Sequence, residues 1–443
     1  MTHEGKRRNI LFFLLGLGTF TKVFLLGCIA ITELACFVLA PYLFIKKYKA
    51  LRRDGFLPFL MLVLLSMVGG VVATCAAGNG MFMLMNHMAR LYSIFSVVVV
   101  FYCFLSENQN GLRWFFVGAC ISSVLSIFVL NPEAHVSEAG LWVEQMRAEE
   151  VFEGVMFWMQ RLRSLMDVFI SGFYFETPMP VLLSLPIVYV IVLAATTVTG
   201  RSASLAVLVG WGLILLAGKS RERMLNVGKR FPILLIVCVL FMFALKGIYT
   251  FAARNSLLTE EAVKKFENQT KDGSGVMQIL MKGRVHFFIG LDACIQNPIL
   301  GYGCFPVDKN GIREKFYNKW GDDSYYASRM RYFKKYGRMP NELIPAHSYI
   351  VGAWLNYGIF GLLMWGYVIV LAINHIRRNI AAVPQWYGYF ALAVPTLLWD
   401  IMFSPFTERI IAPLTVCCLL LARAIGRAQR SPMLAQGQRF LSR

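Results

Sequence analysis

Long apolar runs recur along the whole chain, and their length constrains the fold more than any other feature of the sequence. A helix needs about 20 predominantly apolar residues to cross a bilayer. Of the 443 residues, 57% are hydrophobic and only 16% are charged, which lies outside the range of soluble domains. We therefore expect an all-α polytopic membrane protein. The candidate spans are residues 10–20, 23–45, 57–77, 82–105, 113–130, 179–199, 202–218, 232–252, 348–372, 385–403 and 410–424.

Basic residues gather beside the apolar runs, and they predict which loops face the cytoplasm. Positive charge favours the inner side of a membrane, and this rule explains the formal net charge of +19 better than a nucleic-acid partner does. Clusters at residues 6–8 and 46–53 flank the first two runs, so these runs form a hairpin with both ends inside. No cleavable signal is apparent, so the N-terminus is expected to stay cytoplasmic. The basic tail 423–430 and the loop 219–230 also belong inside, which places residues 253–347 outside.

The acidic segment 131–150 belongs outside as well, whereas the span 179–199 must start in the cytoplasm. One further crossing is therefore needed between them, in addition to the apolar runs. We place it at residues 151–173, where Glu153 and Asp167 are among the charges that favour a buried or broken helix. The prediction is about twelve transmembrane helices with one large, partly helical outer loop. The chain then divides into N-terminal transmembrane helices at 1–252 with a smaller outer segment at about 131–178, the large loop at 253–347, C-terminal helices at 348–425 and a basic cytoplasmic tail at 426–443.

The large outer loop contains an amphipathic helix, predicted over residues 279–296 and ended by Asn297 and Pro298. Arg284 lies near its start and on its apolar face, whereas His286 is predicted to point elsewhere. A guanidinium held against apolar surface needs an anion, which is either a protein carboxylate or a bound ligand. The apolar stripe that we assign to the same face consists of Phe287, Phe288, Leu291, Cys294 and Ile295.

The stretch from Arg313 to Arg338 mixes positive charge with aromatic rings. It has eight Lys or Arg residues against three acids, interleaved with Phe, Tyr and Trp, and it follows a tight turn at 301–303. Aromatic faces stack on sugar rings and cations attract phosphates, so this surface suits a glycan or phosphate ligand at the membrane interface. The alternative is an interfacial belt without a specific ligand, which composition alone slightly favours.

Three polar residues fall at the outer boundary of the membrane. Arg201 and His347 each begin a predicted span, and Arg284 lies on the helix between them in the sequence. Two guanidiniums together can bind a diphosphate through paired hydrogen bonds, and a histidine can accept a proton near neutral pH. Each also has a structural interpretation, because a lone arginine at a span end often marks topology and a histidine there can cap a helix.

Other polar residues are supporting candidates. His87 and Arg90 share the outer part of one span, and Glu408 and Arg409 flank the last outer turn close to Asp400. No His or Cys grouping has metal-ligand spacing, and no glycine-rich phosphate loop is present, so we expect neither a metal nor a cofactor.

Four short strings, in order, carry a resemblance to a known family. They are residues 199–205 (TGRSASL), 283–303 with Gly283-Arg284-Val285 at the start and a Gly-Tyr-Gly end, 347–348 (HS) and 356–361 (NYGIFG). This order, around one large outer loop, resembles the O-antigen ligase and polymerase superfamily of bacterial inner-membrane glycosyltransferases, with the ligase branch favoured. The likeness covers roughly residues 179–425.

The resemblance implies an inverting, metal-independent transfer of glycan from undecaprenyl diphosphate to lipid A-core, which yields lipopolysaccharide on the periplasmic side of the inner membrane. Arg201 and Arg284 match the arginines expected to hold the donor diphosphate, and His347 matches the histidine expected to activate the acceptor hydroxyl. The family often has His-Asn where this chain has His347-Ser348, which puts a role for the following amide in doubt.

Two alternatives remain open at this level. A related O-antigen or exopolysaccharide polymerase would use the same donor but a second lipid-linked repeat as acceptor, with residues 131–178 as a second periplasmic loop. A lipid or solute transporter, with His87, Arg90 and Asp400 lining a path, is disfavoured because no internal repeat is visible and the outer loop is elaborate.

Overall fold

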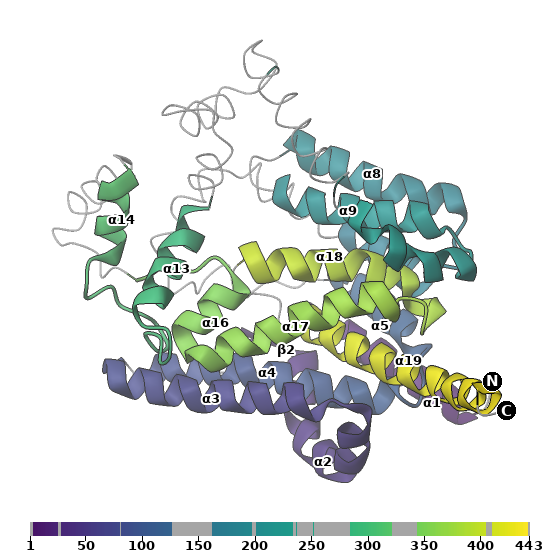
Figure 1. Ribbon diagram of the computed structural model, residues 1–443, viewed down its shortest axis with the longest axis horizontal. Helices are drawn as coiled ribbons and strands as arrows, with labels where there is room; N and C mark the ends of the chain where they lie inside the picture. Colours follow the sequence, from purple (N-terminus) through teal and green to yellow (C-terminus); the bar gives the residue numbers. More distant parts are fainter. Residues whose placement is uncertain are drawn as a thin grey trace.

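A computed structural model of the chain shows a bundle of helices that lie largely side by side (Figure 1). The structure describes residues 3–24, 28–79, 81–125, 162–196, 201–233, 236, 251, 284–320, 343–404 and 410–441. The prediction of an all-α protein is confirmed for this part of the chain, with one short hairpin as the exception.

The N-terminal half contributes elements up to α9. They are α1 (His3–Leu17), β1 (Lys22–Phe24), β2 (Cys28–Ala30), α2 (Ile31–Asp54), α3 (Leu57–Ala77), α4 (Met81–Leu105), α5 (Gly111–Leu125), the π-helical turn η2 (Asp167–Gly172), α8 (Met179–Thr196) and α9 (Arg201–Ala217). The C-terminal half contributes α13 (Val285–Gln296), α14 (Ile312–Trp320), α16 (Tyr349–Tyr357), α17 (Ile359–Arg378), the 3-10 turn η3 (Pro384–Trp386), α18 (Tyr387–Phe403) and α19 (Ile411–Leu441).

Four of the described helices are long and apolar enough to cross a membrane. They cover Leu57–Ala77, Leu84–Leu105, Ile359–Arg378 and Ile411–Arg430. Shorter apolar helices cover Gly111–Leu125, Met179–Val190, Ala206–Ala217 and Val285–Gln296. These helices support a multi-pass membrane protein. The total of twelve crossings stays a prediction, because residues 126–161 and most of 234–283 lie outside the described part of the chain.

Two predicted spans are wrong as single helices. The run 23–45 starts as the antiparallel hairpin β1–β2, and α2 begins only at Ile31, where the Glu33 carboxylate accepts the backbone N–H of Ala30 at 3.0 Å. The run 348–372 is divided into α16 and α17 at Gly358, whose φ is +65°. A side chain at Gly358 would also collide with the carbonyl oxygen of Ile299. The hydrophobic pattern of the sequence does not show this helix break, because the residues on both sides of Gly358 are equally apolar.

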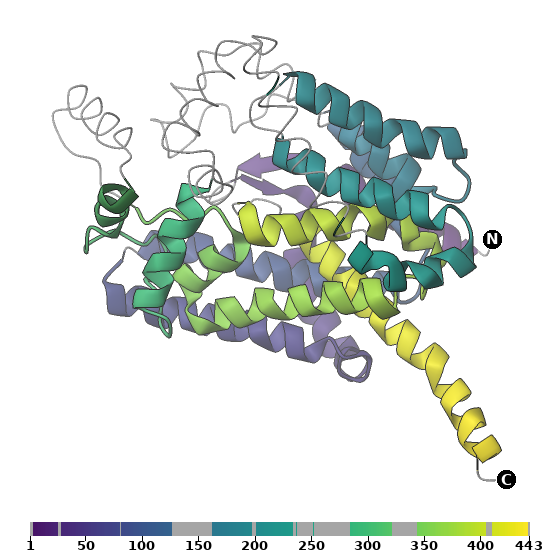
Figure 2. The same cartoon turned by 45° about the horizontal axis from the view of Figure 1, so that its top comes forward.

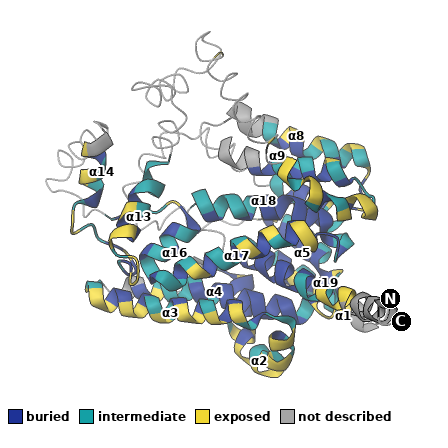
Figure 3. Ribbon diagram, in the orientation of Figure 1, coloured by how far each residue is buried: buried dark blue, intermediate teal, exposed yellow. Residues whose placement is uncertain are grey.

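Burial follows the pattern expected of a helix bundle in lipid. The middle of α4 is enclosed, with Val97 and Phe101 fully buried. In contrast, α2 and α3 expose large apolar side chains on the outside of the bundle, such as Val38 at 71% and Ile45 at 78% exposure (Figure 3). Because lipid tails are as apolar as these side chains, exposed aliphatic residues on a bundle surface fit a membrane environment.

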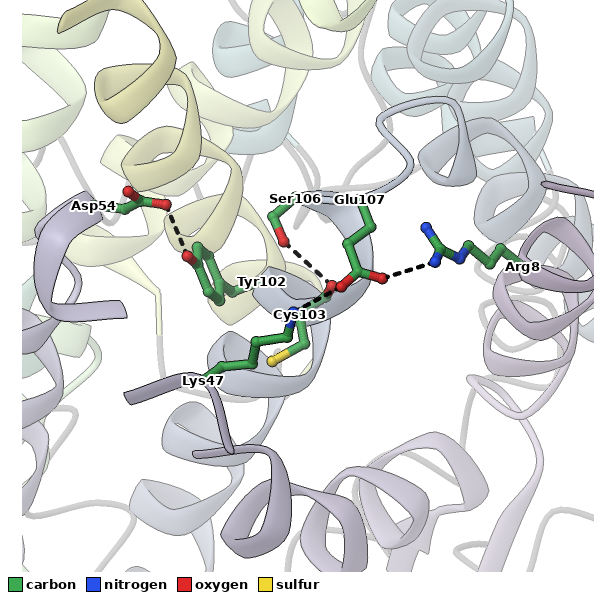
Figure 4. A network of polar contacts seen from close by, with 7 residues as sticks. All are labelled: Arg8, Lys47, Asp54, Tyr102, Cys103, Ser106 and Glu107. Atoms are coloured by element: carbon green, nitrogen blue, oxygen red, sulfur yellow. Dashed lines mark hydrogen bonds and ion pairs between the residues drawn. The ribbon is translucent and has the colours of Figure 1, made fainter. Parts of the chain in front are cut away.

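One end of the bundle collects basic residues around Glu107, just after α4 (Figure 4). The Glu107 carboxylate accepts from Lys47 of α2 at 2.8 Å and lies 3.1 Å from the guanidinium of Arg8 of α1. The Arg427 guanidinium of α19 donates to the backbone carbonyl of Asp54 at the same end. The first two predicted runs therefore place their basic clusters together, as the hairpin prediction required, and this end fits the cytoplasmic side.

Candidate functional site

The C-terminal end of α18 is the point where Arg284 and the segment that carries His347 meet. Arg284 is the N-cap residue of α13, and its Nη1 donates a hydrogen bond to the carbonyl oxygen of Phe403 at 3.1 Å. The guanidinium also lies over the rings of Trp399 and Phe403, 5.4 and 5.3 Å from their centroids. Phe287 packs on Phe403 with ring centroids 5.8 Å apart. Aromatic faces and one carbonyl thus hold the cation in place.

Arg284 has no carboxylate partner among the described residues. Burial lowers its pKa, but a guanidinium stays protonated in proteins. Within the described part, one of its N–H groups is used by Phe403. The half-buried cation therefore retains the capacity to bind an anion. The suggested internal partner Glu408, together with Arg409, lies outside the described residues.

His347 lies next to this cation and forms a pair with His286 of α13. Their Nδ1 atoms are 2.9 Å apart, and the ring centroids are 4.4 Å apart. Burial, then the charges of His347 and Arg313, lower the pKa of His286 to about 4. Burial of part of the His347 ring, and then the Arg284 guanidinium, lower the pKa of His347 as well. Both imidazoles are therefore neutral near pH 7, and one Nδ1–H is shared between them.

His286 is the residue that sequence reasoning missed, because the face of α13 was assigned wrongly. The buried residues of α13 are Ile289, Gly290, Ala293 and Cys294, while Ile295 is 62% exposed. The helix packs through small residues, since a side-chain carbon at Gly290 would lie 2.9 Å from the carbonyl oxygen of Pro345. His286 precedes Gly290 by one turn and so shares its face. The spacing His286, Gly290, Ala293 was the signal available in the sequence.

Helix α13 also starts later than predicted in the described chain, at Val285. Arg284 is consequently at the helix start rather than within it, with a non-helical φ of −135°. The predicted glycine turn is confirmed, because Gly301 and Gly303 both have positive φ. Cys294 and Cys304 are both buried and free, so they do not form a disulfide.

Ser348 ties His347 to α18. Its hydroxyl caps α16 by accepting the N–H of Val351 at 3.2 Å, and it donates to the carbonyl oxygen of Ile401 at 2.8 Å. The side chain is 1% exposed. The residue after His347 therefore has a structural task that a hydroxyl performs, where the resembling family often has an amide.

Arg201 begins α9, which runs antiparallel to α18. The Tyr387 hydroxyl donates to the carbonyl oxygen of Leu213 at 2.6 Å. A side-chain carbon at Gly210 would lie 2.4 Å from the carbonyl oxygen of Ala391. Nine residues of helix, or roughly 13 Å, lead from Gly210 back to Arg201 and from Ala391 forward to Asp400. The start of α9 and the end of α18 therefore lie at the same end of the bundle, as both views show (Figure 1 and Figure 2). The structure describes the backbone of Arg201 but not its side chain.

The loop after α13 braces this arrangement. The backbone N–H of Tyr302 donates to the carbonyl oxygen of Leu355 at 2.7 Å, and the Asn79 amide beyond α3 donates to the carbonyls of Tyr302 and Cys304, both at 3.0 Å. The C-terminal end of α13 is thereby fixed to α16 and α3. Its N-terminal end, with Arg284 and His286, is correspondingly restrained.

His87 and Arg90 belong to a different place. The His87 Nδ1 lies 3.2 Å from the hydroxyl of Tyr357, at the C-terminal end of α16. Ser348 lies at the other end of that helix, about 13 Å away by helix rise. The structure thus does not join His87 and Arg90 to Arg284 and His347. Within the described ranges no cluster of three or more His, Cys, Asp or Glu side chains could hold a metal ion.

Together, the fold and these contacts define a multi-pass membrane protein with a cation and a histidine pair at one end of the bundle. Residues 185–366 match the family model described as O-antigen ligase. The match covers less than half of the chain, includes Arg201, Arg284 and His347, and confirms the resemblance to this family found in the sequence. At that level it supports the activity of an O-antigen ligase or a related polymerase. No curated protein matches the chain.

Proposed function

We propose that this protein is an O-antigen ligase of the bacterial inner membrane, with its active site facing the periplasm. It would transfer glycan from undecaprenyl diphosphate to lipid A-core, with inversion and without a metal ion. The observation that carries the proposal is the meeting of Arg284 and the histidine pair at the end of α18, where α9 also starts. The related polymerase is the alternative, and a transporter is the third candidate.

The reaction would be a single displacement. A hydroxyl oxygen of lipid A-core forms a bond to the anomeric carbon of the donor glycan, on the face opposite the diphosphate. The bond between that carbon and the diphosphate oxygen breaks, and the undecaprenyl diphosphate leaves with the electron pair. The hydroxyl proton goes to His347, which is exposed and neutral near pH 7 and later releases the proton to solvent.

The arginines would act on the leaving group. Arg284 has donors and a full positive charge free of any carboxylate in the described structure, so a diphosphate can bind it and its developing charge is stabilised there. Arg201, at the start of α9, is proposed as the second diphosphate ligand. The aromatic rings of Trp399 and Phe403 keep Arg284 from turning toward bulk water.

Reconstitution in proteoliposomes distinguishes the candidates. The purified protein is supplied with glycan on undecaprenyl diphosphate and with lipid A-core, and the products are separated by mass. Glycan joined to the core supports the ligase, whereas longer lipid-linked chains would replace it with the polymerase. Neither product, combined with solute or lipid flux across the vesicle, would replace it with the transporter.

The variants Arg284→Ala and His347→Ala test the site itself. Each is expected to abolish measurable transfer, because loss of a general base costs on the order of 10²–10⁴ in rate and loss of a donor to a developing anion costs about 10²–10³. Expression and membrane insertion should be unchanged. Arg223→Ala is the matched control, since this arginine is exposed in the helical segment 221–233. Wild-type turnover by either site variant would remove that residue from the mechanism.

A further inference from the structure

His286 faces the candidate base through a ring nitrogen rather than through a hydrophobic edge. The Nδ1 atoms of His286 and His347 are 2.9 Å apart, which is the length of a good hydrogen bond. A neutral imidazole carries one N–H, so one ring donates and the other accepts. Whichever ring donates at Nδ1 has its Nε2 left as a free acceptor.

We infer that His286 is a positioning residue whose Nδ1 accepts the Nδ1–H of His347 and so keeps the Nε2 of His347 unprotonated. This inference rests on the proposed function, in which His347 takes the proton of the acceptor hydroxyl. In the opposite arrangement the Nε2 of His347 would carry the hydrogen, and that atom could not accept a proton. The pair thus selects the tautomer that a general base needs.

His286 also suits the protonated form of His347 as a hydrogen-bond acceptor. After proton uptake His347 is an imidazolium, and its Nδ1–H remains directed at the neutral Nδ1 of His286, 2.9 Å away. Hydrogen bonds from a charged donor are roughly twice as strong as neutral ones. His286 therefore stabilises the charged state that forms during transfer.

The groups around the pair keep His286 in its accepting form. The charges acting on His286 come from His347 and from Arg313 on α14, and the charge acting on His347 comes from Arg284 at the start of α13. Burial is the larger cause of the lowered pKa for both rings, Arg313 and Arg284 are permanent cations, and His347 adds a positive charge only after it has taken up a proton. Protonation of His286 would place a further cation there, so the ring stays neutral and can accept.

Backbone geometry holds the two rings in register. His286 lies one turn before Gly290, and Gly290 packs so closely that a side-chain carbon would lie 3.0 Å from Cγ1 of Val351. His347 directly precedes Ser348, which is bonded to Ile401 and to the N–H of Val351. The two rings are thus carried by the starts of α13 and α16, which pack against each other at Gly290 and Val351.

Three substitutions of His286 test the inference in the full-length, reconstituted protein. His286→Phe keeps an aromatic ring but cannot accept, and we expect a roughly 10–100-fold fall in kcat with the KM for donor unchanged. His286→Asn places an amide oxygen near the former Nδ1 and should retain most of the wild-type rate. His286→Asp supplies a charged acceptor, which should move the acid limb of the kcat profile to higher pH by raising the pKa of His347.

The outcomes separate the inference from the proposed function. Wild-type turnover by His347→Ala would overturn the proposed function and the inference with it. A lost activity in His347→Ala combined with a wild-type rate in His286→Phe would overturn the inference alone. Equal losses in the Phe and Asn variants would do the same, since they would indicate packing rather than hydrogen bonding. If the Phe variant fails to insert, an unshifted acid limb in His286→Asp is the overturning result.

Discussion

The spacing between α13 and α16 should control transfer, and Gly290→Ala perturbs it directly. An added methyl carbon would lie 3.0 Å from Cγ1 of Val351 and 2.9 Å from the carbonyl oxygen of Pro345. Carbon atoms pack at about 3.5–4.0 Å, so the helices have to separate by roughly 0.5 Å. The Nδ1 to Nδ1 distance of 2.9 Å then increases to about 3.4 Å, which is longer than a good hydrogen bond.

We expect Gly290→Ala to lower kcat strongly and to lower the free energy of unfolding only slightly. A misplacement of 1 Å can cost about 10²-fold, so half of it predicts roughly a tenfold lower kcat. Overpacking costs about 1–3 kcal/mol, but alanine is about 1 kcal/mol better than glycine in a helix, so the free energy of unfolding should fall by only about 0–2 kcal/mol.

Rates are measured in proteoliposomes, with thermal unfolding in detergent as the stability measurement. Gly352→Ala on α16 is the matched control, because its added carbon would meet Ala346 at an ordinary 3.6 Å. A wild-type rate for Gly290→Ala would refute the reasoning. So would an equal loss in Gly352→Ala, which would indicate a general sensitivity of this region.

Three other outcomes are expected. Ser348→Ala removes a helix cap and leaves the Ile401 carbonyl without its donor, so it should cost about 2–3 kcal/mol in thermal unfolding and also reduce transfer. Burial, and then the Arg284 guanidinium, lower the pKa of His347 below its usual 6.5 in the free enzyme, and a bound diphosphate would offset the charge of Arg284. Base activity is lost as pH falls through this pKa, so it should decline at a higher pH for kcat than for kcat/KM, and the reverse order would contradict the assignment. Tyr357→Phe, which removes the hydroxyl near His87, should leave transfer unchanged and cost about 1 kcal/mol of stability; a large loss of rate would bring His87 back into the mechanism.

The length of the apolar runs correctly predicted helices that continue without a break. The runs at 57–77, 179–199 and 202–218 correspond to α3, α8 and α9 within a few residues. It failed at Gly358, where a turn with positive φ interrupts an apolar sequence because Ile299 occupies the adjacent space. That contact joins residues far apart in the sequence, so no local pattern could have indicated it.

The sequence indicated the residues of the candidate site that belong to a motif, but it did not indicate the residue whose position depends on helix packing. Arg284 and His347 were found from their placement beside spans and from the family resemblance. His286 was not, because the face of α13 was assigned by counting large apolar side chains. A helix that packs closely buries its small residues, here Gly290 and Ala293, and leaves Ile295 exposed. In a membrane, large size alone does not distinguish a buried face from one in contact with lipid.

The end of α18 holds Arg284 in a way that suits the anionic substrate of the proposed function. The last carbonyls of a helix lack partners within it, and here Asp400, Ile401 and Phe403 receive donors from Ser404, Ser348 and Arg284 respectively. A carbonyl orients a guanidinium without cancelling its charge, whereas a carboxylate would neutralise it and compete with a diphosphate. Holding the arginine by a helix end and two aromatic rings therefore keeps a full positive charge beside His347, and the same charge lowers the basicity of His347 until an anion binds. In the proposed mechanism, donor binding and activation of the acceptor are thereby coupled through one side chain.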